Sequence, residues 1–146
     1  MFTLRLATVD DVAHVLPRTA ALNAHESIDL EPAALEASLR TLLRDPALGR
    51  VWLIARDGAP VGYAITTFGY DLEFNGLEAW LTELWIDDHA RAHGGGGAVL
   101  DLLAGELKAL GIAAVHLQVR PENRARRLYE RRGFEASPRI VMTRRL

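Results

Sequence analysis

Short stretches of hydrophobic residues, some of them alternating with polar residues, predict seven β-strands. The alternation is clearest in Met1 to Leu6, where apolar side chains occupy every second position, as in a half-buried strand. The stretch from Leu77 to Ile86 is the longest and ends in a mostly apolar segment. The predicted strands cover residues 1–6, 51–56, 61–68, 77–86, 113–119, 134–136 and 140–144.

Four other segments have the spacing and the end signals of helices. Thr8 and Asp11 form a capping box with Asp in place of Glu, and Pro32 suits the first turn of a helix. Gly111 follows a hydrophobic helical stretch, at the place where glycine usually ends a helix. The predicted helices cover residues 8–22, 32–44, 97–110 and 123–132.

The turn residues predict how the central strands connect. Asp57-Gly58 and Asn75-Gly76 are typical of tight hairpins, so the strands at 51–56, 61–68 and 77–86 should form an antiparallel meander. The strand at 77–86, the helix at 97–110 and the strand at 113–119 form a βαβ unit, whose two strands should be parallel neighbours. We therefore expect an α/β (α+β) fold in a single domain, residues 1–146.

Composition narrows the class of protein. The 146 residues carry a formal net charge of −2, which gives no sign of a nucleic-acid partner. There is no cysteine, which excludes disulfides, thiolate zinc sites and a cysteine nucleophile. No apolar run reaches the roughly 20 residues that span a bilayer. We expect a cytoplasmic protein with neither a membrane nor a nucleic acid as partner.

Four consecutive glycines, Gly94 to Gly97, precede the third predicted helix. Such a run is costly in backbone entropy, and it is useful where the backbone must approach something closely. The start of a helix offers free N–H groups and the positive end of the helix dipole, which together favour an anion. One interpretation is a phosphate-bearing ligand on Gly94 to Ala98, and the other is a flexible lead-in without a ligand.

Two stretches have the form of known sequence motifs. Arg91-Ala-His-Gly94-Gly-Gly96, between a predicted strand and a predicted helix, has the pattern Gln/Arg-x-x-Gly-x-Gly/Ala. Ala125-Arg-Arg-Leu-Tyr129-Glu-Arg-Arg-Gly133-Phe134 has the pattern Ala-x-x-Leu-Tyr-x-x-x-Gly-Phe. Both resemble motifs of the GCN5-related N-acetyltransferase (GNAT) superfamily, in which the first is the acyl-CoA loop between a strand and a helix. The resemblance implies a mixed, mostly antiparallel sheet of about seven strands, with helices on both faces.

The resemblance also implies acetyl-CoA as co-substrate, with no metal. Its phosphates would lie on the glycine loop, and its amide-rich arm would pair with the backbone of the strand before that loop. A backbone N–H group of this strand would also stabilise the negative charge that develops on the thioester carbonyl oxygen when the amine attacks. The cofactor-binding residues implied are Leu84, Trp85, Ile86, Arg91, His93, Gly94, Gly95, Gly96, Gly97, Ala98, Asn123 and Arg126.

Two residues are candidates for proton transfer. Tyr129 would be the general acid, because an ordinary tyrosine holds its proton at neutral pH and can give it to a thiolate. Glu83 lies in an apolar strand, where burial would raise its pKa and suit it to act as a base, directly or through water. A packing role for Tyr129 and an ion-paired Glu83 are the alternatives. His116, inside a predicted strand, is expected to be a core histidine.

The expected function is transfer of an acetyl group from acetyl-CoA to a primary amine, by direct attack within a ternary complex. The acceptor would be a small molecule or a peptide, and the family resemblance implies a homodimer. The alternative is a non-catalytic domain on the same scaffold that binds acyl-CoA and has a regulatory role. Six arginines between Arg120 and Arg132 could form a nucleic-acid patch, but helical spacing scatters them, which favours a solvated face.

Overall fold

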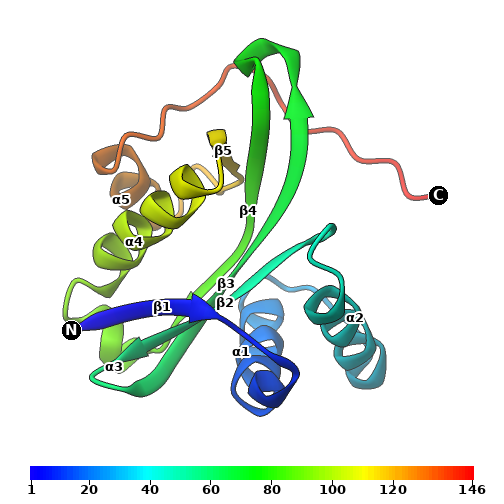
Figure 1. The fold of residues 1–146 in the computed structure, drawn as a ribbon, viewed down its shortest axis with the longest axis vertical. Coiled ribbons are helices and arrows are strands. Elements are labelled where there is room, and N and C mark those ends of the chain that lie inside the picture. Colours follow the sequence, from blue (N-terminus) through cyan, green and yellow to red (C-terminus); the bar gives the residue numbers. More distant parts are fainter.

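The computed structural model describes residues 1–146, and a five-stranded mixed sheet forms its centre (Figure 1). The strands follow one another in chain order, and all neighbours are antiparallel except β4 and β5, which are parallel. The strands are β1 (Phe2–Leu6), β2 (Gly49–Arg56), β3 (Ala59–Asp71), β4 (Gly76–Ile86) and β5 (Ile112–Leu117).

Helices cover both faces of this sheet (Figure 1). One face carries α1 (Val12–His25) and α2 (Pro32–Arg44), and the other carries α4 (Gly95–Ala109) and α5 (Ala125–Arg131). Shorter pieces are α3 (Asp88–Arg91) and two 3₁₀ turns, η1 (Val9–Asp11) and η2 (Leu72–Phe74). No helix is long and apolar enough to cross a membrane.

The alternation of side chains along β2 separates the two cores. Val51 and Leu53 pack with α1 and α2, while Trp52 packs with the α4 side of the sheet. Successive residues of a strand point to opposite faces, so a strand covered on both sides is hydrophobic throughout its middle. The mixed α+β architecture is therefore the predicted one, built on two hydrophobic layers.

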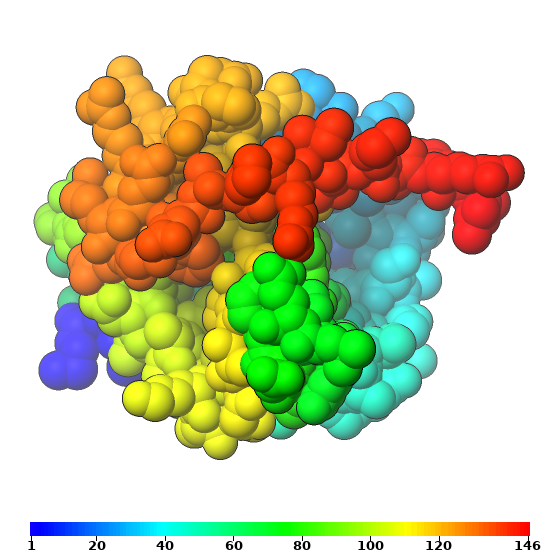
Figure 2. Space-filling model, turned by 90° about the horizontal axis from the view of Figure 1, so that it is seen from above, coloured from blue at the N-terminus to red at the C-terminus, as the bar shows by residue number.

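The prediction of seven strands was wrong, because residues 134–136 and 140–144 form no strands. After α5 the chain crosses the surface beside the β3–β4 hairpin (red beside green in Figure 2), where Arg139 donates a hydrogen bond to Glu73 at 2.8 Å. Ile140 and Met142 are more than 80% exposed. A strand requires a hydrogen-bonding partner as well as a hydrophobic pattern, and this segment has none.

The first hairpin follows the expected turn chemistry. Asp57 and Gly58 both have positive φ, 51° and 84°, as the two central residues of a tight β-hairpin turn require. The second connection is longer than predicted, because η2 precedes Asn75, which alone takes the left-handed conformation with φ 52°. Both connections produce the predicted antiparallel meander of β2, β3 and β4.

Strands β4 and β5 separate part of the way along β4. Their pairing runs from Leu77 with Ile112 to Leu81 with Leu117, and stops there. Beyond this point Glu83 to Ile86 pair only with β3, and Thr82 is the extra residue of a bulge opposite Ile65 and Thr66. We call the gap between the two strands beyond Leu81 and Leu117 the fork.

The four glycines form the ordered start of α4 and are not a flexible lead-in to it. Gly94 is its N-cap with φ 73°, and the helix begins at Gly95, two residues earlier than predicted. A side chain on Gly95 would begin 2.8 Å from the Phe2 ring, and one on Gly96 2.6 Å from Leu128. The Arg132 guanidinium occupies the corresponding space at Gly97. This turn therefore lacks side chains because β1 and α5 pack directly on its backbone.

An ion pair joins β1 to the start of the helical layer. Arg5 donates two hydrogen bonds of 2.8 Å to Asp11, and the Thr8 N–H donates another of 2.8 Å to the same carboxylate. The side chain of Asp11 is only 8% exposed. The hydrogen bond from Arg5 lowers the pKa of Asp11 to about 2.

We expect Asp11→Asn to lower the free energy of unfolding at pH 7 by about 1–2 kcal/mol, because a buried, charge-assisted contact is lost. The folded-state pKa lies below the ordinary value, so this stabilisation is complete above about pH 4 and disappears as the pH falls towards 2. Urea unfolding across this pH range measures it. The exposed neighbour provides the control, Asp10→Asn, and a mutational effect that does not change with pH would contradict the assignment.

We expect Gly95→Ala to lower the free energy of unfolding by about 1–3 kcal/mol, because the new methyl group overlaps the Phe2 ring. Gly105 provides a matched control in the same helix, since a Cβ there meets no atom within 4 Å. Gly105→Ala should raise the free energy of unfolding by about 0.5–1 kcal/mol. Thermal or urea unfolding of both variants tests the pair, and similar effects at both positions would disprove the packing argument.

Candidate active site at the fork of strands β4 and β5

The backbone of β4 offers free hydrogen-bonding groups at the fork. Asp87 N–H donates to the Val61 carbonyl at 2.8 Å, and the ladder alternates, so Trp85 also directs its backbone groups at β3. Leu84 and Ile86 direct their backbone N–H and C=O groups into the fork. The Ile86 carbonyl accepts a hydrogen bond of 2.6 Å from Arg91 Nε. Of the predicted stretch Leu84 to Ile86, the groups left for a ligand are therefore those of Leu84 and the Ile86 N–H.

The glycine turn lies next to the open end of this fork. Ile86 and Val99 of α4 belong to one buried cluster. Arg91 holds α3, just before the glycine turn, against β4, because its guanidinium also lies 4.8 Å from the centre of the Trp85 ring. His93, just before Gly94, is exposed. Free N–H groups at the start of a helix of 15 residues thus adjoin the unpaired backbone of β4.

Tyr129 of α5 packs on the buried cluster that includes Leu81, the last residue of β4 that pairs with β5. Its ring packs on the core of the α4 side and makes an edge contact with Phe134, with 5.8 Å between ring centres. The charge of Glu26, which lies at the end of α1 on the other side of the sheet, acts on the Tyr129 hydroxyl. Burial first, and then the charge of Glu26, raise the pKa of Tyr129. A raised pKa keeps the phenol protonated at neutral pH, as a proton donor must be.

Glu83 lies on the α1 and α2 face of β4. Its cross-strand partner is Ile65, whose side chain belongs to the core on that face. The fully buried Tyr63 hydroxyl donates a hydrogen bond of 2.8 Å to Glu83. Burial raises the pKa of Glu83, although the hydrogen bond from Tyr63 opposes the shift. A carboxylate with a raised pKa binds a proton more readily, so Glu83 fits a proton acceptor.

Two predicted residues have local partners within the α5 region. Asn123 Oδ1 accepts a hydrogen bond of 2.9 Å from Ala125 N–H and so caps the start of α5. Arg126 pairs with Glu130, one helical turn later, at 2.9 Å. These contacts use the Asn123 oxygen and hold the Arg126 side chain along the helix. A contact with a cofactor would use the Asn123 amide N–H₂ or require Arg126 to leave Glu130.

Sequence reasoning missed two ion pairs that join α1 and its end to the chain just after β5 and β4. Arg120, three residues after β5, lies 3.7 Å from Glu26 at the end of α1. Arg18 of α1 binds Asp87 with a closest approach of 2.6 Å, and Trp85 Nε1 donates to the same carboxylate. These pairs join residues far apart in the sequence, and no local pattern signals them.

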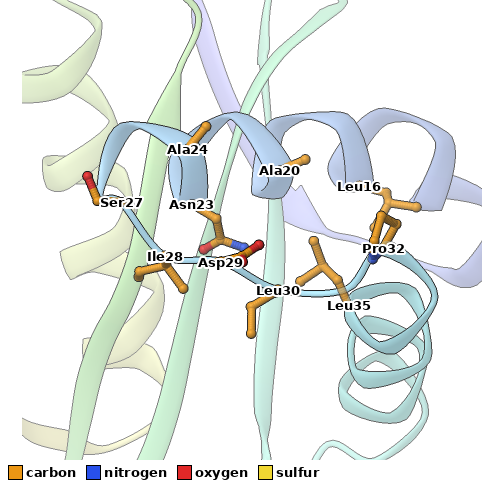
Figure 3. Close-up of a pocket in the computed structure, with 10 residues that line it drawn as sticks. All are labelled: Leu16, Ala20, Asn23, Ala24, Ser27, Ile28, Asp29, Leu30, Pro32 and Leu35. Carbon is orange, nitrogen blue, oxygen red and sulfur yellow. The ribbon is translucent and has the colours of Figure 1, made fainter.

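A pocket of about 450 Å³ lies between α1, α2 and the loop that joins them (Figure 3). Its lining is mainly aliphatic, with Asn23 and Asp29 among the polar residues. None of the predicted site residues lines it. Glu26, at the start of the same loop, is nevertheless close enough to Tyr129 for its charge to raise the pKa of that phenol.

Comparison with known proteins identifies the family. Residues 16–134 match the model of the acetyltransferase (GNAT) family. An integron cassette protein from the mobile metagenome of Cole Harbour Salt Marsh is 29% identical, with a TM-score of 0.84 over 98% of this chain and 90% of that one. No curated protein matches the sequence.

Two further solved structures share the fold. A ribosomal-protein-alanine N-acetyltransferase from Brucella melitensis biovar Abortus 2308 is 19% identical, with a TM-score of 0.81 over 99% of each chain. A predicted acetyltransferase from Clostridium acetobutylicum, described with acetyl-CoA, is 18% identical, with a TM-score of 0.77 over 99% of this chain and 96% of that one. Together with the family match and the fork beside the glycine turn, they lead to one conclusion: the chain belongs to the GNAT family of acetyltransferases.

Proposed function

We propose that this protein is a cytoplasmic N-acetyltransferase that moves an acetyl group from acetyl-CoA to a primary amine by direct attack in a ternary complex. The observation that carries the proposal is the fork: the unpaired backbone of β4 lies beside the glycine turn of α4, and Tyr129 packs on the buried cluster that contains Leu81 at its apex. Family membership supports the same reaction class.

The residues present fit acetyl-CoA. The N–H groups of Gly95, Gly96 and Gly97 suit its phosphates, whereas the Gly94 and Ala98 N–H groups already donate to the carbonyls of Arg91 and Gly94. The backbone of Leu84 suits its amide-rich arm. When bound, acetyl-CoA supplies an activated acetyl thioester. The chain's own contribution is to hold the arm in an extended form along β4, with the thioester end towards Leu81.

Three groups of the chain then serve the transfer. A backbone N–H of β4 at the fork stabilises the negative charge on the carbonyl oxygen, a contribution of about 2.7–4 kcal/mol to the barrier in comparable sites. Glu83, directly or through water, accepts a proton from the attacking nitrogen. Tyr129 donates its proton to the departing sulfur. No step requires a covalent enzyme intermediate.

Acetyl-CoA at about 100 times its Kd should stabilise the protein by about 2.7 kcal/mol. A thermal-shift assay measures this, and S-acetylpantetheine, which lacks the nucleotide phosphates, is the control and should give a much smaller shift. Thiol release in a screen of primary amines then identifies the acceptor. Absence of any shift with acetyl-CoA would overturn the proposal, and a shift without turnover on any amine would favour the non-catalytic domain.

Tyr129→Phe should lower kcat about 10²–10⁴-fold, because the proton donor is lost. The affinity for acetyl-CoA should change little, since the phenyl ring keeps the contact with Phe134. Thiol-release kinetics and a binding titration separate the two effects. Tyr70, which is 66% exposed on β3, provides the control, Tyr70→Phe. A variant at position 129 with unchanged kcat would exclude Tyr129 as the proton donor.

A further inference from the structure

A carboxylate–imidazole pair lies at the closed end of the fork. Glu78 Oε2 approaches His116 Nε2 to 2.8 Å, and the two side chains are only 16% and 26% exposed. His116 stands opposite Trp80 in the β4–β5 ladder, one position before the last pair, Leu81 with Leu117. The pair is therefore next to the point where β4 and β5 begin to separate.

The register places this pair on the same face as Glu83. Trp80 pairs with Thr67 and Glu83 with Ile65, and residues two apart on β3 point to the same side. Glu78 pairs with Gly69, so it shares that face as well. The bulge at the fork keeps Trp80 and Glu83 on one face although they are three residues apart. Two separate acidic positions thus flank the apex of the fork on the side of α1.

The surroundings of His116 fix which nitrogen is free. Phe74 and Trp80 enclose the imidazole, with ring centres 5.2 Å and 5.0 Å away. Nε2 is buried and lies 2.8 Å from Glu78 Oε2, although the contact is not aligned as a hydrogen bond. A bare Nε2 would set its lone pair against the carboxylate, so this approach favours the tautomer with the proton on Nε2. Nδ1 is then left with its lone pair, makes no hydrogen bond to the protein and is not among the buried atoms.

Gly69 makes room for the carboxylate of this pair. A side chain at this position would begin 3.2 Å from Glu78 Oε1. The backbone of β3 therefore holds one side of Glu78, while the imidazole contacts the other. This arrangement fits an imidazole that is oriented by a carboxylate and offers its other nitrogen as a base.

We propose that His116, oriented by Glu78, takes the first proton from the acceptor, which arrives as an alkylammonium ion. This inference rests on the proposed acetyl transfer and adds a substrate class, namely strongly basic primary amines. His116 Nδ1 accepts one proton from the ammonium nitrogen, which frees its lone pair for attack on the carbonyl carbon. As the C–N bond forms and the C–S bond breaks, Glu83 takes the second proton from nitrogen and Tyr129 gives one to sulfur. One proton is released overall.

His116 is a catalytic residue in this scheme, and Glu78 is a positioning residue that acts through it. The distinguishing property of the pair is that an amine already neutral in solution does not need it. Glu83, by contrast, is needed for every amine, because the nitrogen loses a second proton whatever its initial state. The two proton acceptors can therefore be separated by the basicity of the substrate.

The kinetic test compares 2-phenylethylamine with its 2,2-difluoro analogue, in which fluorine makes the amino group far less basic. His116→Gln should lower kcat/KM for the basic amine about 10²–10⁴-fold, and should change it only a few-fold for the fluorinated one. Glu78→Gln should show the same selectivity with a smaller loss, whereas Glu83→Gln should affect both amines alike. His14→Gln, on the exposed side of α1, is the matched control.

Equal losses for both amines in His116→Gln would overturn the inference while leaving acetyl transfer intact.

A second measurement uses the unaltered protein and needs no substrate. Long-range ¹⁵N–¹H NMR spectra of histidine-labelled protein report the tautomer of His116 directly. A protonated Nε2 with a bare Nδ1 is expected, and Glu78→Gln should shift this signal. A protonated Nδ1 in the neutral ring would overturn the inference, whether or not either amine is acetylated.

Discussion

The site depends on one constraint: backbone hydrogen-bonding groups at the interior edge of a sheet must find partners. Beyond Leu81, β4 loses β5 as a neighbour, yet it stays in the middle of the fold. Arg91 satisfies one of the exposed carbonyls, that of Ile86, and the remaining groups at Leu84 and Ile86 face the gap. The separation of two strands thus turns ordinary sheet backbone into a binding surface with a fixed direction.

The two candidates for proton transfer belong to different layers of the fold. Tyr129 comes from the α4 and α5 side, and Glu83 lies under the α1 and α2 side with Tyr63 as its partner. Burial shifts the pKa of both side chains upward. For a tyrosine the shift preserves the proton, and for a glutamate it increases the affinity for one. The same physical cause therefore suits the two residues to opposite tasks.

Local signals in the sequence were enough for most of the fold. Pro32 indicated the start of α2, and Asp57-Gly58 indicated the first hairpin. The last two strands were predicted from their hydrophobic residues alone and do not form, because pairing depends on what lies beside a segment. The hydrophobic pattern of residues 140–144 contains no information about a partner.

Part of the candidate site could likewise be predicted from the sequence, and part could not. Two sequence motifs pointed to the glycine turn and to Tyr129, since both use residue types with special backbone or acid–base properties. The contacts of Glu26 with Arg120, and of Glu78 with His116, join positions that only the sheet register and the end of α1 bring together. For that reason the sequence predicted a core histidine at position 116, whereas the structure places His116 beside the Glu78 carboxylate at the fork.

The glycine turn has a consequence for the order in which the molecule assembles. A helix start without side chains has little intrinsic tendency to form, so it relies on neighbours for its order. Those neighbours are Phe2 near one end of the chain and Leu128 and Arg132 near the other. Contacts of such large sequence separation form late in folding. The glycine turn is therefore completed only when both ends of the chain have docked, which makes the geometry of the candidate site depend on the integrity of the whole domain.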